Sequence, residues 1–147
     1  MPANTPLPRL HFRRLWQYLG WVMTATVVWL SLTPNPPPLP VPLLSWDKAQ
    51  HALAYLSLMF WYRQAFRRHW RWPVFLLALG TVLECLQGLG ETRTFDLRDI
   101  YANGIGVAIG LALASTRLGG ILEKIDTLLA LFFNKIRTKP GRRPTAN

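Results

Sequence analysis

Cysteine and acidic residues are scarce in this chain of 147 residues. The single cysteine, Cys85, excludes a disulfide bond within the chain and a metal site built from several cysteines. Only seven Asp and Glu residues stand against 17 Lys and Arg residues, which gives a formal net charge of +10 at pH 7. The imbalance raises the question of which anionic partner the basic residues face.

Two familiar motifs are also missing. The chain has no HExxH pair of histidines, so it lacks the signature of a zinc metalloprotease. The glycine-rich stretch GIGVAIG at 104–110 is not a dinucleotide fingerprint, because no strand precedes it and no βαβ unit surrounds it. Close helix packing through Gly106 and Gly110 is the better interpretation.

Long segments lack charge. Residues 15–33 carry none, residues 72–90 carry one Glu, and two further apolar runs occupy 46–62 and 99–116. Such runs suit a hydrocarbon core about 30 Å thick. They predict an all-α, integral membrane four-helix bundle over 15–116. A cleaved signal peptide is disfavoured, because no small-residue cleavage site follows the first run.

The basic residues are unevenly placed along this pattern. Of the 17, 14 lie before the first expected span, between the second and third, or after the fourth. Because positive residues accumulate on the cytoplasmic side, both termini are expected to be cytoplasmic in a bacterial inner membrane, with 1–14 as a basic N-terminus. Anionic membrane lipid then accounts for the charge, and no nucleic-acid partner is expected.

Residues 117–137 differ from the four spans. Their apolar positions recur every three or four residues and form one face, at Leu118, Ile121, Leu122, Ile125, Leu128, Leu129, Phe132 and Ile136. This predicts an amphipathic helix on the inner membrane surface, with packing beneath the other helices as the open alternative. The basic tail 138–147 is expected to be disordered.

Polar residues gather at corresponding depths of three expected spans. Ionisable groups at such depth normally face a bundle interior or a watered cavity. They predict an outward-opening polar pocket that binds a ligand. Its candidate residues are Asp47, Lys48, His51, Glu84, Gln87, Arg93, Asp96, Asp99 and Asn103.

The order and spacing of these residues resemble a known family. DKAQHALAYLSL and LECLQGLGETRTFDLRDIYANGIGVAIG, within 47–110, are similar to the motifs of the VanZ-like family of bacterial membrane proteins. The resemblance implies a four-span membrane domain. It also implies an effect on susceptibility to teicoplanin, a lipoglycopeptide antibiotic, through an unspecified mechanism.

Several uses of the pocket stay open. The favoured one is non-enzymatic binding of an envelope lipid or lipoglycopeptide, with Lys48, Arg93 and Arg98 holding an anionic group. An intramembrane enzyme is the alternative, with His51, Glu84 and Asp99 as catalytic candidates. Asp47, His51, Glu84 and Asp99 have the ligand types of Zn²⁺ or Mn²⁺, but with no metal motif we expect no metal or other cofactor. The polar groups could also serve only to hold the helices together, and the glycine contact could join helices of one chain or of a homo-oligomer.

Overall fold

The computed structural model describes residues 10–33, 47–66, 70–89 and 95–137. These ranges contain five α-helices, one short 3-10 helix and no strand, so the all-α prediction is confirmed. The elements, with their bounds, are α1 (Arg13–Leu32), α2 (Asp47–Ala65), α3 (Arg71–Gly88), α4 (Leu97–Ala114), η2 (Arg117–Gly120) and α5 (Ile121–Arg137).

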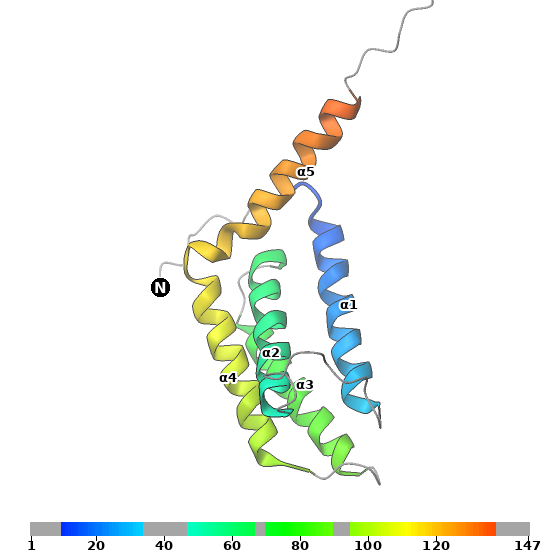
Figure 1. Cartoon of the computed structure of the whole chain (residues 1–147), viewed down its shortest axis with the longest axis vertical. Helices are drawn as coiled ribbons and strands as arrows, with labels where there is room; N and C mark the ends of the chain where they lie inside the picture. Colours follow the sequence, from blue (N-terminus) through cyan, green and yellow to red (C-terminus); the bar gives the residue numbers. More distant parts are fainter. Residues whose placement is uncertain (1–9, 34–46, 67–69, 90–94, 138–147) are drawn as a thin grey trace, which may run out of the picture.

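Four of the helices run side by side in alternating directions, and α5 leans away from one end (Figure 1). Helix α2 is central, because it packs against α1, α3 and α4. Its most extensive contact is with α4. The start of α2 and the start of α4 therefore lie at the same end of the bundle, opposite α5.

The helix ends differ from the expected spans for identifiable reasons. Helix α4 begins at Leu97, two residues early, because Asp96 caps it: its Oδ1 accepts a hydrogen bond from Arg98 N at 2.9 Å. The segment 117–137 is not one continuous α-helix. It opens with the 3-10 turn η2, whose last two residues are glycines with low helix propensity, and Thr116 caps that turn at Leu118 N.

Aromatic rings form the core between α1, α2 and α3. Tyr62 stacks on Phe66 with ring centroids 4.7 Å apart, and Trp72 packs against both rings at 4.9 and 4.6 Å. The Tyr62 hydroxyl, which is fully buried, is 2.8 Å from Thr24 Oγ1 of α1. A ring cluster with a satisfied hydroxyl joins three helices at the end of the bundle near α5.

The outer surface of the bundle is rich in apolar side chains. Exposed residues on α1–α4 include Leu15, Trp21, Val22, Trp29, Leu53, Val74, Leu77, Val82, Leu86, Ile105 and Ile109. Within the described helices, α4 alone combines 18 residues with a mean hydropathy of 1.2, enough by length and composition to cross a membrane. The charged residues of α2 and the Trp, Tyr and Thr residues of α1 lower the mean hydropathy of those helices. The expected four-span membrane bundle is thus not confirmed, although its helices are present.

Two glycines let α4 approach α2 closely. A Cβ atom on Gly106 would collide with the carbonyl oxygen of Ala52, and one on Gly110 would lie 2.6 Å from the carbonyl oxygen of Leu56. Both neighbours are α2 backbone, which cannot move aside as a side chain can. The contact made by Gly106 and Gly110 in this structure is therefore within one chain.

Candidate functional site

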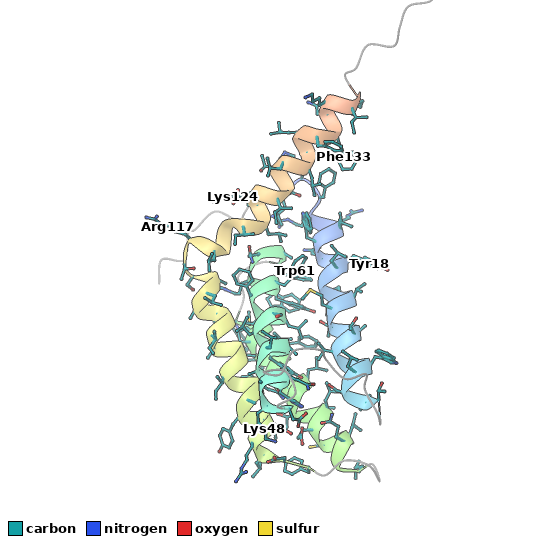
Figure 2. The ribbon with its side chains drawn as sticks, viewed as in Figure 1. Tyr18, Lys48, Trp61, Arg117, Lys124 and Phe133 are labelled. Atoms are coloured by element: carbon teal, nitrogen blue, oxygen red, sulfur yellow. The ribbon has the colours of Figure 1, made fainter. Side chains whose placement is uncertain are left out.

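Lys48 joins α2 to the start of α4. Its Nζ lies 2.7 Å from Asp96 Oδ2 and 2.7 Å from Asp99 Oδ1, with Asp47 Oδ2 farther away at 4.0 Å. Figure 2 shows Lys48 at the end of the bundle opposite Arg117 and Lys124. The side chain of Asp99 is 8% exposed, whereas that of Asp47 is 50% exposed. Lys48 therefore lies between an exposed carboxylate, Asp47, and a buried one, Asp99.

His51 lies one turn deeper on α2. Its Nδ1 is 3.3 Å from Asn103 Oδ1 of α4, and its Nε2 is 3.8 Å from Asp47 Oδ1. Because an amide oxygen only accepts hydrogen bonds, the Asn103 contact assigns the proton to Nδ1. The Nε2 atom then carries the lone pair and faces the carboxylate of Asp47.

Glu84 connects α3 to the same group. Its Oε1 accepts a hydrogen bond from the backbone N–H of Asp96 at 2.7 Å. The side chain is 1% exposed, and Oε2 has no hydrogen-bond partner among the described residues. The buried Tyr55 hydroxyl, on which the Glu84 carboxylate acts electrostatically, is unpartnered within the same set. Two polar atoms are thus left available inside the bundle, where an unmade hydrogen bond costs about 1–3 kcal/mol.

The cluster has an excess of carboxylates. The hydrogen bond from Lys48 lowers the pKa of Asp96 below its ordinary value, and the N–H of Arg98 adds to the effect. Among the described residues, the four carboxylates of the cluster lie with one cationic side chain, Lys48, while the charge of Arg98 acts on Asp96 from an exposed position. The expected anion clamp is weakened by this geometry, because Lys48 already pairs with two carboxylates.

Three of these residues lie close enough together to hold a metal ion. One ligand atom from each of Asp47, His51 and Asp99 lies within 4.8 Å of the others. Imidazole nitrogen and carboxylate oxygen suit Zn²⁺ and Mn²⁺. The cluster thus has the donor set for a divalent cation as well as the groups for acid–base chemistry.

Most of the candidate residues meet, and one described candidate, Gln87, does not enter this cluster. The structure brings together seven, namely Asp47, Lys48, His51, Glu84, Asp96, Asp99 and Asn103. Gln87 instead donates a hydrogen bond from Nε2 to the carbonyl oxygen of Ser31 at 2.7 Å, so it links α3 to the end of α1. Arg93 lies outside the described residues.

Sequence reasoning missed a second buried polar group, Asp126 of α5, which was placed off the apolar face. Asp126 is fully buried and accepts hydrogen bonds from the backbone N–H groups of His11 and Phe12, and from Trp16 Nε1 at 2.7 Å. Burial alone would raise the pKa of Asp126, but these hydrogen bonds outweigh it and lower the pKa below its ordinary value. The only signal in the sequence was an acidic residue inside an apolar helical segment.

A cleft of about 590 Å³ lies beside Asp126, between α5 and the residues around the start of α1. Its lining includes Phe12, Leu131 and Phe133. It is at the opposite end of the molecule from Lys48 (Figure 2). His11, Asn134 and Arg137 also line the cleft, but it contains none of the predicted site residues, so the Lys48 cluster remains the stronger candidate site.

Comparison with known proteins supports the resemblance seen in the motifs. The VanZ/LLP1 family model matches residues 6–119, which covers most of the chain and all of the clustered residues. Searches of curated proteins and of solved structures gave no match. On the strength of the family match, this chain belongs to the VanZ/LLP1 family.

Proposed function

We propose that this protein crosses the bacterial inner membrane four times through α1–α4 and binds the polar headgroup of an envelope amphiphile at the Lys48 cluster. Three observations support the membrane part: the exposed apolar side chains around the bundle, the length of α4, and basic residues concentrated at the end near α5. In this orientation the cluster opens to the outer side.

The observation that carries the binding function is that two buried atoms near the cluster, Glu84 Oε2 and Tyr55 Oη, have no hydrogen-bond partner among the described residues. Groups that served only to hold helices together would be expected to pair with one another. Lys48 forms ion pairs with Asp96 and Asp99, whereas Glu84 Oε2 and Tyr55 Oη have no hydrogen-bond partner among the described residues. A headgroup hydroxyl or amine that reaches Glu84 and Tyr55 would supply the missing partners.

Enzyme action on the same lipid is the second candidate. It is favoured by His51, whose Nε2 is unprotonated when Nδ1 donates to Asn103 and is therefore available as a general base. In that mechanism Asn103 orients the neutral imidazole through Nδ1, and Asp47 stabilises the imidazolium formed once Nε2 has taken a proton. Glu84 would position the headgroup rather than exchange protons with His51.

Native mass spectrometry of the purified protein with a panel of envelope lipids and teicoplanin tests the proposal. We expect one class of amphiphile to be retained with its mass unchanged. A changed ligand mass would establish the enzyme alternative instead. Equal retention of every amphiphile by the wild type and by the Asp99→Asn variant would refute specific binding at the cluster.

A matched control separates a site effect from a charge effect. Glu123→Gln removes one carboxylate from the exposed surface of α5, far from the cluster, and should leave ligand retention unchanged. The same variants, expressed in a susceptible bacterium, test the link to glycopeptides. We expect the wild type and Glu123→Gln, but not Asp99→Asn, to alter the teicoplanin concentration that stops growth.

A further inference from the structure

We propose that Asp47, His51 and Asp99 form a binding site for a divalent transition metal ion, Mn²⁺ or Zn²⁺, at the Lys48 end of the bundle. The residues come from the first turn and a half of α2 and the first turn of α4. Their ligand atoms already lie within 4.8 Å of one another. Ligand atoms around an ion with bonds of about 2.1 Å are roughly 3–4 Å apart, so only a small closure is needed.

The state of His51 supports a metal ligand. Metal-binding histidines usually donate their second ring N–H to an oxygen acceptor, which fixes the tautomer. Asn103 Oδ1 has this position relative to His51 Nδ1, at 3.3 Å. The free Nε2 is 3.8 Å from Asp47 Oδ1, which is too far for a hydrogen bond but suitable for two ligands of one ion.

The charge of the cluster provides a separate argument. Among its described residues, two carboxylates remain without a formal counter-charge after Lys48 and Arg98 are counted, and a divalent ion supplies the balance. Glu84, 1% exposed and with Oε2 unpartnered, is joined to this group through the N–H of Asp96. Uncompensated carboxylate in a buried position is unfavourable, so cation binding has a physical driving force.

Lys48 does not fill the proposed site. It pairs with Oδ1 of Asp99, and a carboxylate has further lone pairs on its second oxygen. Lys48 also retains Asp96 at 2.7 Å if the Asp99 contact lengthens. Removing Lys48 is therefore expected to raise the affinity for the ion, which is the opposite of what a purely structural ion-pair network would show.

The metal site deepens the proposed function and rests on it for its biological role. Three protein ligands leave coordination positions open, and Asp47 places them at the exposed rim of the cluster. An ion in this position would bind phosphate oxygens of a lipid headgroup. Lys48 is less suited to that role, because it already pairs with Asp96 and Asp99. The headgroup class is then a phosphate-bearing amphiphile.

Titration of the untagged, chelator-treated full-length protein with Mn²⁺ alone, followed by electron paramagnetic resonance, tests the site. We expect one saturable ion per chain, displaced by Zn²⁺. His51→Ala should weaken binding at least 10-fold, and Asn103→Ala should weaken it about 10- to 100-fold by releasing the imidazole. Lys48→Ala should bind Mn²⁺ more tightly. The control His11→Ala removes a histidine at the other end of the bundle, next to Asp126, and should leave the affinity for Mn²⁺ unchanged.

Folding is monitored by circular dichroism, and Asp47→Asn provides a variant whose half-exposed side chain is not needed for folding. Absence of saturable Mn²⁺ and Zn²⁺ binding up to millimolar concentration overturns the metal site, as does equal binding by the wild type, His51→Ala and Asp47→Asn. Lipid retention is then measured with and without chelator. Retention that survives chelation in a protein that binds no metal leaves the headgroup function standing without the ion. Metal binding without lipid retention leaves the site standing without that function.

Discussion

Glu84 is the residue at which a binding role and a purely structural role predict different results. Glu84→Gln keeps an acceptor for the N–H of Asp96 and removes the charge, so the variant should fold with a loss of stability below about 1 kcal/mol. It should nevertheless lose retention of the amphiphile in native mass spectrometry. Glu84→Leu also leaves the Asp96 N–H unsatisfied and should be less stable by about 2 kcal/mol in thermal unfolding in detergent. A Gln variant that retains the ligand fully would assign Glu84 to helix packing.

Asp126 is expected to matter for stability rather than for ligand binding. From α5 it accepts hydrogen bonds from the backbone N–H groups of His11 and of Phe12, the N-cap residue of α1, whose own side chain forms no capping hydrogen bond. Asp126→Ala should lower the free energy of unfolding by about 3 kcal/mol, because a buried set of donors loses its acceptor. Glu123→Ala, exposed on the same helix, should change it by less than about 0.5 kcal/mol.

The lowered pKa of Asp126 sets the sign of its pH dependence. A carboxylate with a depressed folded-state pKa stabilises the fold at pH values above its ordinary pKa of 3.8, and this stabilisation is lost as pH falls through the folded-state value. The stability difference between wild type and Asp126→Asn should therefore be constant near neutral pH and shrink below about pH 4. If thermal unfolding instead gives the same stability difference between wild type and Asp126→Asn at every pH, the charge of the Asp126 carboxylate does not stabilise the fold.

At the scale of the elements, the contact between α2 and α4 positions the site. Gly106→Ala places a methyl group against the Ala52 carbonyl, so the two helices must separate, at a cost of about 1–3 kcal/mol. Gly104→Ala is the matched control, because its Cβ would meet only Leu77 Cδ2 at 3.9 Å, and its stability should be unchanged or raised. Since α2 carries His51 and α4 carries Asn103, Gly106→Ala should also reduce ligand retention.

At the scale of the whole molecule, the proposed orientation predicts which surfaces reagents reach. With Cys85 replaced by Ser, a cysteine at Phe95, an exposed residue at the site end, should be labelled in intact cells by a membrane-impermeant maleimide. A cysteine at Lys124, exposed on α5, should be labelled only after the membrane is opened. The reverse pattern would invert the topology, and labelling of both positions in intact cells would contradict a cytoplasmic α5.

The sequence by itself determined the all-α architecture, the approximate positions of the helices, the family and the residues that could share a site. These depend on hydrophobic runs and on spacings of three or four residues, which are local properties of the chain. Asp47, His51 and Tyr55 share a helical stripe for this reason.

Only the tertiary structure decided which polar residues of one helix contact which polar residues of another. The spacing of Gly106 and Gly110 predicted a close helix contact, but the partner helix depends on how distant segments pack, and the structure shows that it is α2. The same packing pairs Lys48 with Asp96 and Asp99 and turns Gln87 towards Ser31. It also buries Asp126 of α5, whose carboxylate accepts hydrogen bonds from the N–H groups of His11 and Phe12, directly before α1.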